Sequence, residues 1–382
     1  MPLEPSRAAA LKRLAEFAPH MGADYAQRRN HDGGLGQRCV SGLSAHLRHR
    51  LITESEVVGT ALAHHGAEAA EKFIQEVFWR SYWKGFLELR PAMWAEYRVR
   101  ANAEHERLDG STHLRAAMAG ETGITCFDAW ARELVETGWL HNHARMWFAS
   151  IWIFTLRLPW VMGAEFFLAH LADADAASNT LSWRWVAGIQ TPGKHYLARA
   201  ENIARFTQGR FHPKGELNED ALPIAEPGPP PAGALKPADA MPDGPVALLL
   251  HEDDLCFRAE VAQVLAVALP SQRSVFGVGG PARRFTEGAL RGQGAEMPAL
   301  EGLAAWARGH GVTRIVTPWA PVGWTASMLD AAQALCAAEG VTLHRLRRPW
   351  DSACWPLAVK GFFPFRASIP GLIAQLRPVP PD

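Results

Sequence analysis

A proline-rich segment near the middle of the chain divides the sequence into two parts. Residues 223–245 contain eight prolines, three of them consecutive at 229–231, and hardly any large apolar side chain. A segment of this kind cannot build a core and predicts an extended linker. We therefore expect a first domain at 1–218, a linker at 219–245 and a second domain at 246–382.

The first part has the pattern of a helical domain. Apolar residues recur at helical spacing over 55–76, 125–137 and 143–171, few β-branched runs interrupt them, and glycine, proline and aspartate separate them. The pattern predicts a domain that is nearly all helix. Ten of the 15 tryptophans lie before residue 216. Because a large indole ring with a polar N–H is difficult to accommodate in a core, this density indicates a functional role for some of them.

The second part alternates between strand and helix patterns. Val246–Leu250 and Arg314–Thr317 resemble buried strands, while 257–268, 300–309 and 325–339 resemble helices between them. This alternation predicts a smaller α/β domain of Rossmann-like type with a parallel sheet. The expected fold class is thus multidomain, with an all-α domain followed by an α/β domain.

Charge and cysteine content limit the classes of partner and compartment. The chain contains 39 Lys and Arg residues and 39 Asp and Glu residues, so its net charge gives no overall electrostatic attraction to nucleic acid. Residues 1–215 hold 25 basic and 22 acidic residues, so only this half slightly favours phosphate. The five cysteines are scattered without metal-binding spacing, which predicts free thiols in a reducing, cytoplasmic setting. We find no signal peptide and no apolar run long enough for a membrane span.

Two segments of the first part combine polar and aromatic residues in an unusual way. Gly138–Met146 reads Gly-Trp-Leu-His-Asn-His-Ala-Arg-Met, and His170–Trp185 contains two aspartates followed by an asparagine and two tryptophans. Residues i and i+2 of a helix face different sides, so His141 and His143 do not predict a metal site. Asp173 and Asp175 could simply cap a helix, or one of them could pair with Arg145.

These segments resemble the helical flavin-binding domain of the photolyase/cryptochrome family over roughly residues 20–215. The resemblance is carried by Gly138–Met146, Asp173–Asn179 and Trp183–Trp185, and upstream by Tyr25–Arg29, Val40–Ser44 and Gln75–Arg80. The chain departs from the family at Val40 and Gly42, where the family has threonine and arginine.

The resemblance implies an FAD folded into a U shape within the helical domain. It assigns phosphate binding to Ser41, Ser44 and Arg80, an ion pair beside the ring to Arg145 and Asp173, and a place facing flavin N5 to Asn179. The cofactor-binding residues implied are Tyr25, Ser41, Leu43, Ser44, Arg80, Trp139, Asn142, Arg145, Asp173, Asp175 and Asn179.

The resemblance also implies a pocket for a pyrimidine dimer flipped out of damaged DNA. Its residues would be Glu76, Trp79, Asn142, Met146 and Trp185. The alternative is that Trp79 and Trp185 are core aromatics. At His143 the family usually has an arginine, which weakens the expected grip on the DNA backbone.

Light-driven reduction in many family members uses three tryptophans in series. Trp183 and Trp160 match the first two, and the third place falls near Arg107. Either the series of donors ends early, or another aromatic residue such as Trp94 or Trp152 replaces the third, or a chemical donor reduces the flavin.

The second part resembles the antenna domain that usually precedes the flavin domain, and this resemblance implies a reversed domain order. The matching segments are Val246–Leu255 and Lys360–Phe365, and an unrelated α/β domain remains the alternative. An antenna chromophore is therefore possible. Gly277–Gly280 is more typical of a turn than of a phosphate-binding loop.

Three functions are consistent with the sequence. The first is a blue-light-dependent photolyase-like lyase that splits pyrimidine dimers by electron transfer. The second is a cryptochrome-like photoreceptor that acts through a signalling protein partner. The third is a flavoprotein that does neither.

Overall fold

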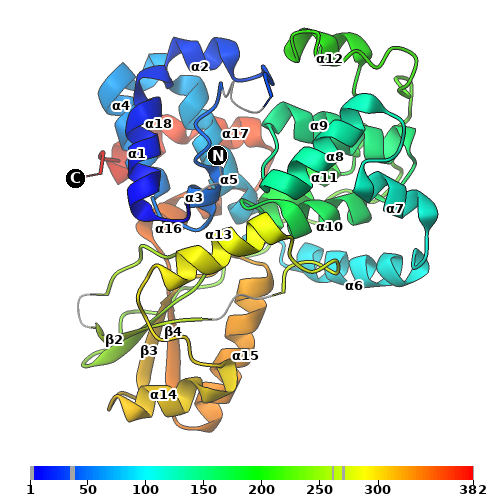
Figure 1. Cartoon of the computed structure of the whole chain (residues 1–382). Helices are drawn as coiled ribbons and strands as arrows, with labels where there is room; N and C mark the ends of the chain where they lie inside the picture. Colours follow the sequence, from blue (N-terminus) through cyan, green and yellow to red (C-terminus); the bar gives the residue numbers. More distant parts are fainter. Residues whose placement is uncertain (1–3, 35–38, 260–261, 269–271, 382) are drawn as a thin grey trace.

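The computed structural model describes residues 4–34, 39–259, 262–268 and 272–381. The helices before the proline-rich segment are α1 (Arg7–Phe17), α2 (Ala23–Arg28), α3 (Ser44–Arg48), α4 (Glu54–Ala69), α5 (Glu71–Glu88), α6 (Ala92–Arg107), α7 (Thr112–Ala119), α8 (Thr125–Thr137), α9 (Asn142–Ser150), α10 (Trp160–His170), α11 (Ala176–Val186) and α12 (Ala200–Phe206). They form the upper part of the molecule in Figure 1. The prediction of a helical first part is confirmed.

Local signals explain where the main helices begin and end. Thr53 and Glu56 form a reciprocal capping box that starts α4, and Asp175 caps α11. The expected continuous helix over 143–171 is interrupted, because Pro159 cannot donate a backbone hydrogen bond. The chain instead passes through a π-helical turn at Ile151–Thr155, and α10 begins at Trp160.

A four-stranded parallel sheet follows, with the order β2-β1-β3-β4. Its elements are β1 (Val246–Leu250), β2 (Ala262–Val267), α13 (Gly280–Arg291), α14 (Leu303–Gly309), β3 (Arg314–Pro318), α15 (Trp324–Ala338) and β4 (Thr342–Leu346). The predicted strands and the parallel sheet are confirmed. The predicted helix over 257–268 is wrong, since Ala262–Val267 pairs with β1 as a strand.

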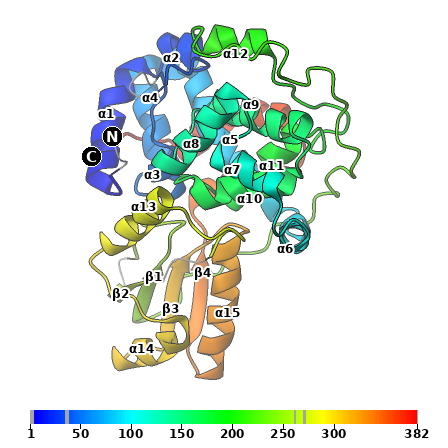
Figure 2. The same cartoon turned by 45° about the vertical axis from the view of Figure 1, so that its right-hand side comes forward.

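The sheet is covered on both faces, which explains why β1 is apolar throughout. Ala247 and Leu249 pack with α14 and α15. Val246, Leu248 and Leu250 pack with α13 and with parts of the helical region, including Ala45 and Ala172. Figure 2 shows α13 lying between the sheet and the helices above it.

The last helices of the chain return to the helical region. They are α16 (Pro349–Cys354), α17 (Phe362–Ala367) and α18 (Ile369–Leu376), and they lie beside α4 and α5 in Figure 1. Trp350, Trp355 and Phe365 belong to the same core cluster as the helices of residues 7–206. The division into domains at 1–218 and 246–382 stays a prediction, and the packing shows that residues after 349 share the helical core.

The proline-rich segment runs along the helical region without forming a helix or strand. Arg90 Nε donates to the carbonyl of Pro230 at 2.8 Å, and Gly233 N donates to that of Leu89 at 2.8 Å. Arg100 forms an ion pair with Glu226 at 2.7 Å. Among the described helices, none is long and apolar enough to cross a membrane.

Candidate flavin site

A cluster of two arginines and two aspartates forms where α5, α9 and the loop before α11 meet. Arg145 Nη2 lies 3.0 Å from Asp173 Oδ2, and Arg80 Nη2 lies 4.0 Å from the same oxygen. Arg80 also forms an ion pair with Asp175. The predicted pair of Arg145 and Asp173 is confirmed.

Neighbouring groups determine the charge state of Asp173 and the position of Asp175. Asp173 is buried, and burial by itself would raise its pKa, but Arg145 and Arg80 outweigh that effect and hold its pKa below the usual value. Asp175 has a structural task as well, because its Oδ1 accepts from Ser178 N at 2.7 Å at the start of α11. The two sequence interpretations are therefore compatible: Asp175 caps a helix, and Asp173 pairs with Arg145.

The predicted phosphate-binding segment lies close to this cluster. Leu43 is buried, Ser44 begins α3, and Ser44 makes a small contribution to the lowered pKa of Asp173. Arg13 Nε donates to the carbonyl of Ser41 at 2.6 Å, which holds the loop before α3.

Tyr25 lies on α2. It is buried edge-on against Phe73 of α5 at a ring-centroid distance of 5.1 Å.

Asn179 is held in a defined orientation on α11. Its Nδ2 donates to the carbonyl of Ala164 on α10 at 2.9 Å, and a carbonyl can only accept, so the assignment of the amide is determined. Oδ1 can still accept a hydrogen bond, and the second hydrogen of Nδ2 can still be donated, so the amide can serve a ligand group of either kind.

Unsatisfied buried atoms near this cluster support the fit to a polar cofactor. Asp173 Oδ1 in the cluster, Ser178 Oγ in the first turn of α11 and Trp183 Nε1 further along α11 are buried without a hydrogen-bond partner among the described residues. Buried polar atoms normally have partners, so these three favour a bound polar group.

The two predicted electron donors lie on neighbouring helices. Trp183 on α11 is buried, and a Cβ on Gly163 of α10 would lie 2.2 Å from Trp183 Cη2. Trp160 is one helical turn before Gly163, so the ring of Trp183 rests on the turn that carries Trp160. Trp152, an alternative third aromatic, is edge-on to Trp183 at 6.2 Å.

We expect Gly163→Ala to displace Trp183. The added methyl group has no room against the indole, and such overpacking costs roughly 1–3 kcal/mol of unfolding free energy. Thermal unfolding and near-UV circular dichroism measure the two effects. Gly302→Ala is the control, because a Cβ at Gly302 meets no atom within 4 Å. Equal unfolding temperatures for both variants would contradict the close packing.

The predicted dimer-pocket residues of α5 are already engaged within the protein. Glu76 forms an ion pair with Arg29 of the chain after α2. Trp79 stacks on Phe362 of α17 with ring centroids 3.5 Å apart and planes at 11°. The sequence analysis did not predict the contact of Phe362 with Trp79, because no local spacing relates α17 to α5.

The remaining pocket residues are placed on α9 and α11. Asn142 is exposed, Met146 is half-buried, and Trp185 is 36% exposed and stacks on Tyr196 at 5.8 Å. Trp139, predicted to contact the cofactor, is buried just before α9.

His143 is packed rather than presented to solvent. Its ring stacks with Trp147 at 5.0 Å and with Phe206 of α12 at 5.2 Å. Burial, followed by the charge of Arg29, lowers the pKa of His143 to about 4. The side chain is therefore neutral at pH 7 and offers no charge to a DNA phosphate.

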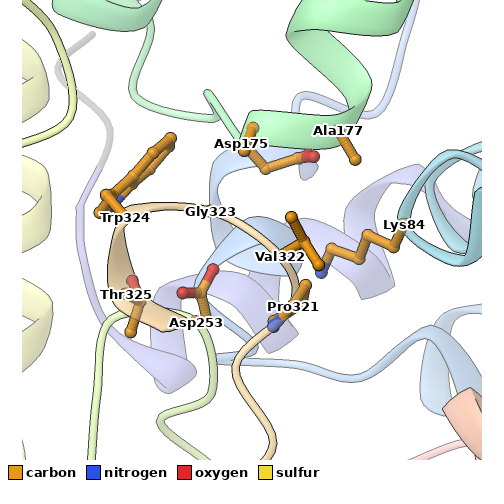
Figure 3. A pocket seen from close by; sticks show the side chains of 10 residues that line it. Lys84, Asp175, Ala177, Asp253, Pro321, Val322, Gly323, Trp324 and Thr325 are labelled. Carbon is orange, nitrogen blue, oxygen red and sulfur yellow. The ribbon is translucent and has the colours of Figure 1, made fainter. Parts of the chain in front are cut away.

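Lys84 is a further buried charge that the sequence analysis missed. Figure 3 shows it with Asp175, Asp253 and Trp324 around a cavity of about 10 Å³, room for about one water molecule. Burial, and then Arg50, lowers the pKa of Lys84. Its spacing of four residues from Arg80 on α5 was the available signal.

The sequence profile described as the FAD binding domain of DNA photolyase matches residues 73–225. Residues 73–225 are thus an FAD-binding domain of the DNA photolyase type. FAD is the cofactor of this domain. The matched range contains Arg80, Arg145, Asp173 and Asn179, whereas Tyr25 and the segment 41–44 lie outside it.

Curated relatives support the same family. The chain is 38% identical over 171 residues to a deoxyribodipyrimidine photo-lyase of Streptomyces griseus, covering 44% of this chain and 36% of the relative. It is 31% identical over 249 residues to that of a Synechococcus strain, covering 59% and 51%. The chain thus spans about half, or less, of the length of these relatives.

Among solved structures, a class III photolyase from Agrobacterium tumefaciens is similar with 27% identity and a TM-score of 0.45. The similarity covers 53% of this chain and 43% of that one.

Proposed function

We propose that this protein is a photolyase-like enzyme that uses blue light and reduced FAD to split pyrimidine dimers in DNA. The observation that carries the proposal is that two helices, α5 and α9, each carry both a residue of the predicted dimer pocket and a residue of the candidate flavin site. On α5, Glu76 precedes Arg80 by four residues and so lies on the same face. On α9, Met146 directly follows Arg145. A lesion in this pocket would therefore lie beside the cofactor.

The chain's own residues would bind and orient the lesion, while FAD, when bound, supplies light absorption and the transferred electron. Burial raises the pKa of Glu76, although Arg29 opposes the effect, so the carboxyl group retains its proton more readily. A protonated Glu76 can donate to a pyrimidine carbonyl. Trp79 and Trp185 would provide aromatic surfaces, and Met146 would fill the space between them.

We expect weak, salt-sensitive binding of DNA and a preference for single strands. Flipping a dimer from a duplex costs a few kcal/mol, which a single strand largely avoids. The neutral His143 and the small excess of basic residues in the first half leave little charge to offset this cost.

The test is blue-light repair of a thymine dimer in single- and double-stranded DNA, at low and moderate salt. Repair should be at least as efficient in the single strand, and Glu76→Ala and Trp79→Ala should each reduce it strongly. Arg107→Ala, which removes an exposed pair with Glu104, is the control. Repair that survives both pocket substitutions would show that the pocket is misplaced.

One observation favours the photoreceptor as a second candidate. Both pocket groups of α5 already have partners, because Arg29 binds Glu76 and Phe362 stacks on Trp79. If fully reduced protein repairs no dimer in any substrate, a cryptochrome-like role with a signalling partner becomes the better proposal.

A further inference from the structure

The third aromatic residue expected for electron transfer is absent at its usual place, where Arg107 forms an exposed ion pair with Glu104. The structure brings a different aromatic residue against Trp160. Helix α6 packs on α10, and the ring of Tyr97 lies 5.8 Å from that of Trp160 at an angle of 34°. Trp94 stacks on Tyr97 with ring centroids 5.2 Å apart.

The charges around Trp160 disfavour a positive charge on its ring. The guanidinium groups of Arg100 and Arg184 lie 5.5 and 5.9 Å from the ring centroid. Like charges at such distances repel, and the repulsion is stronger away from bulk water. Glu226, paired with Arg100 at 2.7 Å, offsets part of this charge, and the remaining guanidinium charge favours the return of an electron to an oxidised Trp160 from a neighbour.

Tyr97 differs from the tryptophans because it is buried beside a carboxylate. Glu165 of α10 is fully buried, accepts from Arg98 Nη1 at 3.0 Å and accepts from Val275 N at 2.8 Å. The pKa of Tyr97 is raised well above its usual value, first by burial and then by the charge of Glu165. Its hydroxyl is buried and has no hydrogen-bond partner within the described residues, so it is free to release its proton to a neighbouring base.

Oxidation of a phenol releases a proton, and a charged phenol radical in an apolar interior is costly. Glu165 is a base next to the group that would release this proton. The product would be a neutral tyrosyl radical, and the proton on Glu165 would stay available for its return.

We propose that Tyr97 is the terminal electron donor of the chain that begins at Trp183, with Glu165 as the acceptor of its proton. One electron passes from Tyr97 to oxidised Trp160, and the phenolic proton passes to the carboxylate of Glu165. A thiol then returns one electron to the radical and is itself oxidised, while Glu165 returns the proton. This inference rests on the light-driven electron transfer of the proposed function.

The test follows the radical itself in the FAD-loaded protein, by electron paramagnetic resonance and transient absorption after a blue flash. We expect a tyrosyl signal in the wild type, its loss in Tyr97→Phe, and a shorter-lived tryptophan radical in its place. Tyr82→Phe is the matched control, because Tyr82 is also buried but donates to the carbonyl of Lys360. Glu165→Gln should slow tyrosyl formation and abolish its dependence on solvent deuterium.

A second measurement separates this inference from the proposed function. Azide radicals generated by pulse radiolysis oxidise tryptophan without light or flavin chemistry. Transfer of the oxidation to tyrosine should occur in the wild type and disappear in Tyr97→Phe. A tyrosyl signal that persists in Tyr97→Phe, or a wild type that forms only tryptophan radicals in both experiments, would overturn the assignment. Absence of a light-induced signal together with normal azide-driven transfer would overturn the photochemical proposal alone.

Discussion

Replacing Asp173 with alanine is expected to strip the protein of its flavin. The substitution leaves Arg145 and Arg80 without the carboxylate that lies between them. Breaking a buried ion pair from one side costs about 3–5 kcal/mol, since the remaining charge stays uncompensated. The ratio of flavin to protein absorbance after purification measures the loss.

Two further variants make this result interpretable. Asp173→Asn keeps the shape and one acceptor oxygen, so it should fold even if the alanine variant does not, and it should still bind flavin more weakly. Glu104→Ala removes only an exposed pair, a type of contact worth about 0–1 kcal/mol, and should retain normal flavin. Full flavin content in Asp173→Asn would remove the ion pair from the account of cofactor binding.

Replacing Arg50 with methionine should cause the largest loss of stability. Arg50 is buried and contacts three carboxylates, those of Glu54 at 3.2 Å, Asp254 at 3.3 Å and Asp351 at 2.6 Å. They belong to α4, the segment after β1, and α16. Without the guanidinium, three buried acidic groups face one another, so we expect a loss on the order of 3–5 kcal/mol in urea unfolding.

The same cluster predicts how stability depends on pH. Although burial opposes it, Arg50 lowers the pKa of Glu54 to about 2, and Arg348 and Arg50 lower that of Asp254. Carboxyl groups with lowered pKa stabilise the fold above their unfolded values of about 4, and this stabilisation is lost as the pH falls towards 2. Arg50→Met should flatten this dependence.

The control is Arg308→Met, which removes an exposed pair with Glu339 and should cost about 0–1 kcal/mol. An Arg50→Met protein as stable as Arg308→Met would show that the three carboxylates are compensated by other groups.

Sequence patterns predicted the elements whose signals are local. Val246–Leu250 could be recognised as a strand because every residue is apolar, as burial on both faces of a parallel sheet requires. The segment 257–268 misled the prediction, because its alanines and leucine also suit a helix. Pairing with β1 decided the outcome, and that pairing has no signal within the segment.

The residues of the candidate site also differ in whether their signals are local. Arg145 and Asp173 could be paired in advance because both lie in recognisable motifs. Phe362 and Tyr97 could not be assigned, since each acquires its importance only through a contact with a distant helix. Glu165 carries no local sequence signal that marks it as a proton acceptor.

The return of α16, α17 and α18 to the helical core affects how the protein acquires its structure. During synthesis, α5 emerges from the ribosome long before the residues that cover Phe78 and Tyr82, among them Trp350 and Phe365. Helical domains usually fold fast because their contacts are local, whereas this one depends on contacts of high sequence separation. Its apolar α5 face stays uncovered until the sheet and the final helices have been made, so the nascent chain exposes apolar surface that favours aggregation for most of its translation.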